Sequence, residues 1–337
     1  ALLTRHGADA GDIRIIPLTM IDDPDTPDID ERRWAAHADD PATVALLADA
    51  GAIWFTGGDQ MRTMALLAPG GRETRLLQAI RARQAAGAVI GGTSAGAAVM
   101  SRQMIAGGEP LPALVLAPRR LDGTAPVESA AGELLMADGL GFLADGLVDQ
   151  HFDARRRLGR LARALFTLPP ERRKGFGIDE NTALRVSGDG RYGEVLGAGS
   201  VTLLDARGAD AALTPALQAK GLRLSVAVPG DRIDLAAMTV EPGPGRAPPP
   251  PSDGEQALPR GRGGMAFAAP ALAALLAEAL ADPASPALER PSVGDGQLLT
   301  YRFSRMASTR ALTGDAGTTI VDVRFDIRST PLPRTAP

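Results

Sequence analysis

Residues Gly92–Gly96 read GTSAG and place a serine hydroxyl among small residues at a sharp corner of the chain. The pattern G-x-S-x-G is typical of a strand-to-helix turn on which a nucleophilic serine stands in a strained backbone conformation. The flanks agree, because Ala88–Ile90 suit a buried strand and Ala95–Met100 can start a helix. Amides at such a helix start lack intrahelical partners and can stabilise an oxyanion. We interpret Ser94 as a candidate nucleophile, with an ordinary glycine-rich turn as the alternative.

A nucleophilic serine needs a base, and the chain has only three histidines from which to supply one. His6 precedes the first strand-like segment and His37 lies in an acidic stretch, so both are most simply solvated loop residues. His151 directly follows the strand-like "GLV", at the point where the ligand crevice of a parallel sheet lies. A lone histidine is more often structural, but His151 is the well-placed candidate for the base.

An orienting acid for the histidine is expected near the end of another short apolar run, "GFGIDENTALRV". Glu180 is the best candidate there, and Asp179 beside it is the competitor. Neighbours on an extended segment point to opposite sides, so one of the two can simply bond backbone. An acid that follows the histidine departs from the order in α/β-hydrolases, where it lies between serine and histidine. That other order would require Asp122 or Glu128.

The elements that must position these groups alternate between strand-like and helix-like segments over residues 1–205. This alternation predicts an α/β fold with a mainly parallel sheet and helices on both faces. The loops at residues 57–60 and 92–96 both follow strands, so we expect them to meet at the carboxyl edge of the sheet. The segments before the serine are a strand over 12–20, a helix over 40–51, a strand over 52–58 and a helix over 72–87.

Composition narrows the class of protein. The 337 residues are 45% hydrophobic but only 4% aromatic, which predicts an aliphatic core, and a net charge of −4 offers no footprint for nucleic acid. Without cysteine there is no disulfide and no cysteine-ligated metal. We expect no membrane span, since the most apolar stretch, residues 265–280, contains Pro270 and Glu278. The compartment stays open between cytoplasmic and secreted or periplasmic, with the start at Ala1 slightly favouring a processed, secreted chain.

The composition and the pattern of the sequence change after residue 205. A proline- and glycine-rich connection lies near residues 241–264, followed by a helix from about Met265. The alternating segments 297–305 and 318–328 resemble strands with one buried face. We therefore predict a catalytic domain over residues 1–205 and a C-terminal α+β extension over residues 206–337, to which its own sequence assigns no chemistry.

Taken together, four blocks of this sequence resemble the cyanophycinases of peptidase family S51, and their order and spacing cover about residues 10–205. The resemblance implies a serine hydrolase on a fold related to class I glutamine amidotransferases and aspartyl dipeptidases. It also implies a triad of Ser94 as nucleophile, His151 as base and Glu180 as orienting acid. The blocks are Phe55–Gln60, Gly91–Ser101, Asp149–Leu161 and Gly177–Leu184.

The resemblance also assigns roles around the triad. It implies backbone amides of Gly58 and Ala95 as oxyanion donors. Arg157 and Arg160 are three residues apart and share a helix face, although an arginine run of this kind can also be a solvated basic face. The residues that the resemblance implies for the substrate pocket are Gln60, Asp149, Gln150, Arg155, Arg157 and Arg160.

Two departures from the family pattern bear on the substrate. In the family, the first strand and a glycine-rich turn should lie before residues 12–20. Here, only a short polar segment precedes residue 12. The stretch between Ser94 and His151 contains "GGEPLPALVLAPRR" and looks longer than the family usually has. An inserted loop there would reshape the pocket.

The resemblance implies a serine-type peptidase that cuts the aspartate backbone of cyanophycin and releases β-Asp-Arg dipeptides through an acyl-enzyme, with no metal or organic cofactor. An aspartyl or isoaspartyl dipeptidase with the same triad is the alternative. A binding protein without turnover is the third reading. The expected partner is the cyanophycin or aspartyl-peptide substrate, and a homodimer is possible.

Overall fold

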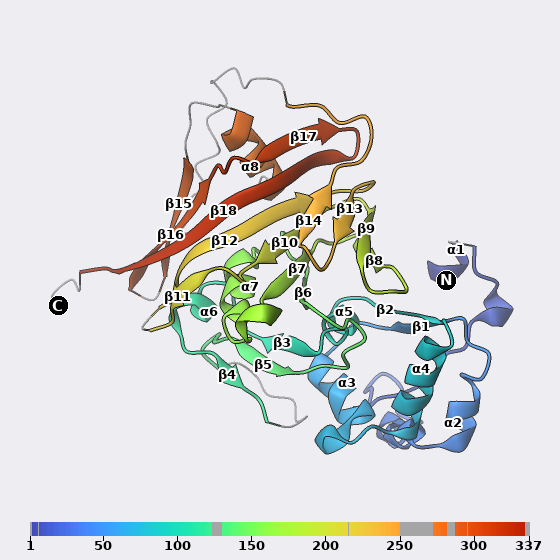
Figure 1. The fold of residues 1–337 in the computed structure, drawn as a ribbon. Helices are drawn as coiled ribbons and strands as arrows, with labels where there is room; N and C mark the ends of the chain where they lie inside the picture. The colour runs from blue at the N-terminus through green and yellow to red at the C-terminus, as the bar shows by residue number, and fades with distance from the viewer. Residues whose placement is uncertain are drawn as a thin grey trace. The chain divides into compact units, whose positions relative to one another are not determined.

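The structure is a computed structural model that describes residues 2–5, 7–122, 130–214, 216–249, 272–281, 287–294 and 296–333 (Figure 1). The chain forms two compact units. The first unit holds Ala1–Gly96 with Asp122–Val127, and the second holds Ala97–Leu121 with Glu128–Pro337.

The first unit is built on two parallel strands, β1 (Ala52–Phe55) and β2 (Val89–Gly92). Side-chain caps begin its main helices, because Asp40, Asp59 and Thr74 each accept hydrogen bonds from amides of the first helical turn. The α-helices are α1 (Leu2–Arg5), α2 (Pro41–Ala45), α3 (Gln60–Leu67) and α4 (Arg75–Ala85), with α5 (Ala95–Ala98) following β2, and the 3-10 helices are η1 (Ala10–Asp12), η2 (Glu31–Ala38) and η3 (Pro69–Gly71).

Two sequence predictions for this unit need correction. The strand predicted over residues 12–20 is wrong, because the segment after η1 has no ladder partner among the described residues. Ile15 is 82% exposed, and Pro17 has no N–H to donate to a ladder. The helix predicted over 40–51 ends at Ala45 and continues as turns.

The second unit is built on a nine-stranded sheet among the described residues. Its main path runs β15-β16-β18-β12-β10-β7-β6, with β11 paired to β12 and β17 paired to β18. The strands are β6 (Leu147–Gln150), β7 (Lys174–Ile178), β10 (Val201–Asp205), β11 (Asp210–Ala212), β12 (Gln218–Ala227), β15 (Ala287–Gly294), β16 (Gln297–Ser304), β17 (Arg310–Gly314) and β18 (Gly317–Pro331).

The sheets are mixed, so the prediction of a mainly parallel sheet is wrong, although the protein is α/β. Only β6 and β7 run parallel in the nine-stranded sheet, and every other described pairing there is antiparallel. The connections explain the difference, because short loops join most of its strands and helix crossovers are few. The strands predicted over 297–305 and 318–328 are confirmed as β16 and β18.

Two smaller sheets complete the second unit. One has the order β14-β13-β9-β8 and the other β3-β5-β4. Their strands are β3 (Gln103–Gly107), β4 (Arg119–Arg120), β5 (Leu135–Asp138), β8 (Thr182–Val186), β9 (Tyr192–Gly197), β13 (Arg232–Asp234) and β14 (Thr239–Glu241), and the helices of the unit are α6 (Pro112–Val115), α7 (Leu158–Leu165), η4 (Pro170–Arg172) and α8 (Leu272–Ala281).

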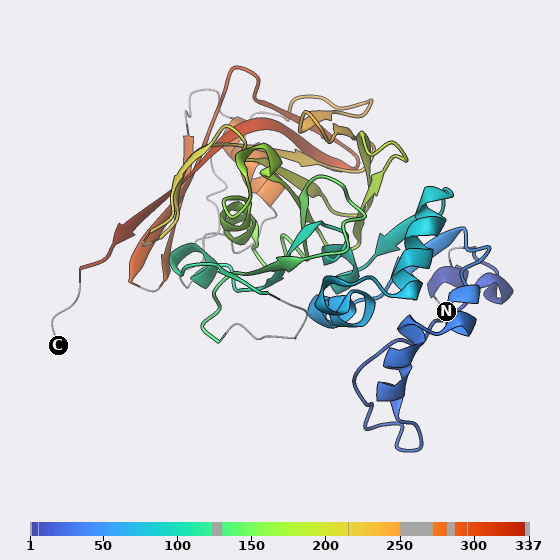
Figure 2. The same cartoon turned by 60° about the horizontal axis from the view of Figure 1, so that its bottom comes forward.

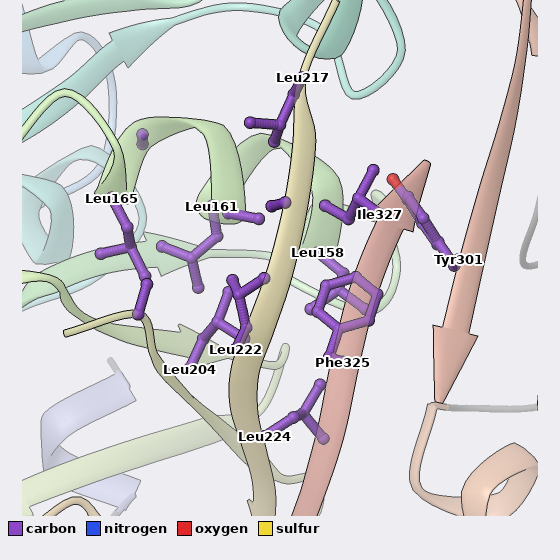
Figure 3. Close-up of a cluster of buried hydrophobic side chains, with 14 of the residues drawn as sticks. Leu158, Leu161, Leu165, Leu204, Leu217, Leu222, Leu224, Tyr301, Phe325 and Ile327 are labelled. Carbon is purple, nitrogen blue, oxygen red and sulfur yellow. The ribbon is translucent and has the colours of Figure 1, made fainter. Parts of the chain in front are cut away.

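Helix α7 lies at the centre of the main core, with all eight of its residues buried. Leu158 and Leu161 pack with Leu222 of β12 and Phe325 of β18 in one hydrophobic cluster (Figure 3). The long strands β12 and β18 run side by side across the unit (Figures 1 and 2). The sheet therefore joins strands from both sides of residue 205, where composition predicted a domain boundary; that boundary stays a prediction.

The helix predicted from about Met265 is observed as α8, while Met265 itself lies outside the described residues. Most of the connection near 241–264 also lies outside them.

Candidate active site

The turn that carries Ser94 has the strained conformation predicted from its sequence. Phe55 of β1 faces Gly92 of β2 in the parallel ladder, and the Thr93 amide donates to the Phe55 carbonyl at 3.0 Å. The next residue, Ser94, has φ of 55°, a left-handed conformation that non-glycine residues rarely adopt. Strain of this kind persists only where the surrounding chain imposes it.

Two glycines permit that conformation by letting backbones approach closely. A Cβ on Gly92 would lie 2.2 Å from the carbonyl oxygen of Gly96, and a Cβ on Gly96 would lie 2.3 Å from that of Phe55. Both neighbours are backbone, which cannot swing aside. The motif therefore needs glycine on both sides of Ser94.

The loop after β1 meets the serine turn, as predicted from the two strand ends. A Cβ on Gly57 would lie 3.2 Å from Cβ of Ser94. Gly58 has φ of 135°, which side-chain-bearing residues avoid. Asp59 then accepts from the Met61 amide at 2.7 Å, which begins α3 at Gln60. The expected oxyanion role of Gly58 stays a prediction, as does that of Ala95.

The second unit holds a histidine–carboxylate pair. Gln150, the last residue of β6, faces Ile178, the last residue of β7, in a parallel ladder, so both loops leave the same edge. Nδ1 of His151 lies 2.8 Å from Oε1 of Glu180. A carboxylate on Nδ1 fixes the ring orientation and directs Nε2 toward proton transfer. The His151 side chain is 25% exposed and its φ is 49°.

Asp179, the competing acid, turns away from the histidine. Its Oδ1 accepts from the Asp153 amide at 3.1 Å, and its Oδ2 accepts from the amide and hydroxyl of Ser200 at 2.9 and 2.6 Å. The two neighbouring carboxylates therefore divide as expected, Glu180 on the ring and Asp179 on Ser200 and a backbone amide, although Glu180 lies in a turn and not on an extended segment. Of the acids that the other chain order would use, Asp122 is exposed and Glu128 lies outside the described residues.

Of the other two histidines, His37 alone lies in the part of the chain that the structure describes. His37 is half-buried in η2, with Nδ1 2.7 Å from the carbonyl oxygen of Pro17, so its interpretation as a solvated loop residue is wrong. His6 lies outside the described residues.

Asp149, two residues before His151, belongs to a buried cluster of charges. Asp149 is fully buried, and Arg160 donates to it through Nε at 3.1 Å and through Nη2. Nη1 of Arg160 donates to the carbonyl of Gly108 at 2.7 Å. Nη1 of Arg157 lies 3.5 Å from Asp149 and donates to the carbonyl of Gln150. Burial lowers the pKa of Arg157 to about 10, with repulsion from Arg160 adding to the shift and Asp149 opposing it.

The arginine run thus divides by position. Arg157 and Arg160 share a helix face, as predicted, but that face is buried on Asp149, so the solvated-face alternative is wrong for both. Arg155 is exposed. Sequence reasoning missed that the two arginines and the aspartate bind one another. The available signal was an aspartate ending a buried apolar run with arginines 8 and 11 residues later.

Asp153 is a further residue that no motif singled out. Its backbone amide and its carboxylate both make hydrogen bonds that connect the loop after His151 to other elements. The part of the chain that the structure describes contains no group of three or more metal-ligating side chains. In that same part, no helix is long and apolar enough to cross a membrane.

Part of the chain matches the model of a known protein family. Residues 35–192 match the family model of peptidase family S51, which confirms the resemblance predicted from the four sequence blocks. The chain is thus similar to serine-type peptidases of that family over the segment that contains Ser94, His151 and Glu180.

Among curated proteins, the chain is similar to cyanophycinases. It is 42% identical over 189 residues to the one from Geminocystis herdmanii, covering 54% of this chain and 61% of the relative. It is 38% identical over 201 residues to that of Trichormus variabilis, covering 56% and 59%. The chain thus spans about three fifths of the length of these relatives. A solved peptidase from an acI-B1 actinobacterium is 25% identical, covers 49% of this chain and 58% of that one, and has a TM-score of 0.33.

Proposed function

We propose that this protein is a serine-type peptidase in which Ser94, His151 and Glu180 form one catalytic triad. The observation that carries the proposal is the hydrogen bond between Nδ1 of His151 and Oε1 of Glu180, because it is the base–acid half of such a triad. The strained conformation of Ser94 supports its role as the nucleophile. That Ser94 joins the pair is inferred from the sequence blocks and the S51 match.

In the proposed reaction, Oγ of Ser94 attacks the scissile carbonyl carbon while Nε2 of His151 takes the hydroxyl proton. Backbone amides of Gly58 and Ala95 donate to the oxyanion that forms. The C–N bond then breaks, and the leaving amine takes the proton from His151. Water next gives a proton to His151 and attacks the acyl-enzyme ester, and Ser94 leaves with that proton.

The proposed substrate is cyanophycin, cut to β-Asp-Arg dipeptides. The names of the similar curated proteins support it. An aspartyl or isoaspartyl dipeptidase is the second candidate. It is favoured by the long stretch of sequence between Ser94 and His151, which contains β3, α6 and β4 and could narrow the pocket. We retain a class I glutamine amidotransferase-like fold as the expected family fold, although the observed sheets are mixed.

In the pocket, we propose Gln60, Gln150 and Arg155 as direct substrate contacts. Arg157 remains a candidate because its guanidinium is only partly engaged by Asp149 at 3.5 Å. For Arg160, three nitrogen atoms donate within the chain, which supports a role in holding Asp149 and the β6 end in place.

The decisive experiment measures products and covalent labelling together. The wild type is incubated with insoluble cyanophycin and, separately, with aspartyl and isoaspartyl dipeptides, and a fluorophosphonate reports the reactive serine. Ser94→Ala should lose labelling and lower kcat by several orders of magnitude with the fold unchanged. Turnover of Ser94→Ala near the wild-type rate would overturn the mechanism. Release of β-Asp-Arg from the polymer separates the two substrate candidates.

A further inference from the structure

We infer that Asp153 is a positioning residue through which helix α8, in the C-terminal part of the chain, holds the loop that carries His151. The inference rests on the proposed role of His151 as the base. It assigns a catalytic contribution to a segment outside residues 35–192, the part that matches the S51 family.

The contact that carries the inference joins residues 119 positions apart. Oδ1 of Asp153 accepts from the amide of Leu272, the first residue of α8, at 3.1 Å. Amides in the first turn of a helix have no partner inside the helix, and a carboxylate there is also favoured by the helix dipole. Asp153, which lies in the loop after His151, therefore acts as a cap for α8.

The other side of the same loop is held by β7. The Phe152 amide donates to the carbonyl of Ile178 at 3.1 Å, and the Asp153 amide donates to Asp179. The Phe152 ring lies so close to Gly177 that a Cβ there would be 2.4 Å from it. Residues 152 and 153 are thus clamped between the end of β7 and the start of α8.

Helix α8 is itself anchored, so it can serve as a fixed support. Leu272 and Leu276 are buried in the same hydrophobic cluster as Phe152 and as Phe325 of β18. This packing holds α8 against the nine-stranded sheet. The hydrogen bond from Leu272 to Asp153 then holds the loop that carries His151 against α8.

This support matters because the backbone conformation of His151 is energetically unfavourable. Its φ of 49° lies in the left-handed region, which a residue with a side chain keeps only when neighbouring contacts impose it. Asp153 is two residues away and holds the chain that leaves this conformation. Loss of the contact lets the loop relax and moves the imidazole away from its reactive geometry, and small misplacements of a catalytic group cost large factors in rate.

The helix side offers a matched pair of variants. Leu272→Pro removes the donated N–H at the first helical position, where proline is tolerated, and Leu272→Ala removes the same buried side chain but keeps the N–H. On the loop side, Asp153→Ala removes the acceptor, while Asp153→Asn keeps Oδ1. The readouts are the second-order rate of fluorophosphonate labelling of Ser94, kcat and KM separately, and Tm.

We expect Asp153→Ala and Leu272→Pro to lower the labelling rate and kcat by about tenfold with KM nearly unchanged, because the base and not the substrate pocket is displaced. Asp153→Asn should retain most of the rate, and Leu272→Ala should lose Tm with much less loss of rate. The double variant of Asp153→Ala with Leu272→Pro should be no slower than the worse single one. Equal rates in Leu272→Pro and Leu272→Ala, or full labelling in folded Asp153→Ala, would overturn the inference.

Two controls separate this inference from general destabilisation and from the proposed function. Asp326→Ala removes an acceptor that takes the Gly221 amide at 2.7 Å in the same sheet, far along the chain from the base loop. It should lower Tm without lowering the labelling rate. If labelling survives in Ser94→Ala, the proposed function fails first. If labelling depends on Ser94 but ignores Asp153, the inference alone fails.

Discussion

Nε of Arg160 donates to Oδ2 of Asp149 at 3.1 Å, and the two side chains are 6% and 0% exposed. Nη2 of Arg160 donates to the other carboxylate oxygen, Oδ1, so the guanidinium binds the aspartate through two hydrogen bonds. Asp149 lies two residues before His151. This pair therefore fixes the end of β6 from which the base loop begins.

Arg160→Lys should lower stability and should reduce the hydrolysis of polymer and of a neutral ester substrate by the same factor. A lysine keeps the charge but cannot span both carboxylate oxygens, so Asp149 is left partly unsatisfied, at a cost of about 1–3 kcal/mol. Thermal unfolding and kcat/KM on both substrates check this. Arg102→Lys, at an exposed position outside the proposed pocket, is the control and should leave Tm unchanged. A selective loss on the polymer of about tenfold, with Tm intact, would restore Arg160 as a direct substrate contact.

Glu180→Gln and Asp179→Asn should separate catalysis from structure. Loss of the carboxylate charge beside Nδ1 removes its stabilisation of the imidazolium, so Glu180→Gln should reduce kcat by about 10²–10⁴ with little change in Tm. Asp179→Asn should lower Tm more, because its carboxylate joins Asp153 to Ser200. Steady-state kinetics and calorimetry decide between them. Larger losses in Asp122→Asn or Glu128→Gln would point to the α/β-hydrolase order.

Gly96→Ala should unfold or strongly destabilise the turn that holds Ser94. The added methyl group would lie 2.3 Å from a backbone oxygen of β1, which has no room to move. Gly51→Ala is the matched control in the same unit, because nothing lies within 4 Å of a Cβ there. Fluorophosphonate labelling and Tm should fall together in the first variant and stay near wild type in the second. A labelled, stable Gly96→Ala protein would contradict the packing.

Asp153→Asn should stabilise the protein at neutral pH. Burial raises the pKa of the Asp153 carboxyl, the nearby Asp179 charge acts in the same direction, and the Leu272 amide opposes them. An acid whose pKa is higher in the folded state adds stability at low pH and loses it as pH rises through that folded pKa. The Tm advantage of the variant should thus be largest near pH 7 and vanish below about pH 4.

Asp189→Asn is a control of opposite sign. The Ser187 hydroxyl and the Arg191 amide lower the pKa of Asp189, so its contribution to stability is present at neutral pH and lost as pH falls through the folded pKa. Its amide variant should lose Tm near pH 7. A Tm profile for Asp153→Asn that runs in the same direction as this control would contradict the assigned shift.

The local geometry of the site was largely predictable from sequence. A serine between glycines implies a strained corner because only glycine lets two backbones approach so closely, and neighbouring acids such as Asp179 and Glu180 can divide between backbone and the histidine. These are short-range constraints. The Asp149–Arg160 pair was not predictable in the same way. An arginine on a helix face gives the same sequence pattern whether that face meets solvent or a buried carboxylate.

The predicted direction of the strands was the larger error. Alternating strand and helix patterns over residues 1–205 predict parallel crossovers, but β10 pairs antiparallel with β7. Beyond residue 205, β12 and β18 also pair antiparallel, across a long separation. Nothing local in β12 or β18 specifies its partner, because both carry several consecutive buried residues and the register shifts along their ladder. The link from Asp153 to Leu272 is equally hidden, since its two ends lie 119 positions apart.

The same pairing sets the order in which the molecule can be completed during synthesis. Leu222 of β12 faces Phe325 of β18, so β12 leaves the ribosome about a hundred residues before the strand that covers its edge. Until then the nascent chain displays unpaired backbone groups beside an apolar face, the kind of edge that recruits strands from other molecules. A chain stopped before residue 317 would keep that edge open. We expect such a shortened chain to aggregate, and the 337-residue chain to fold slowly because the pairing of β12 with β18 joins residues about a hundred positions apart.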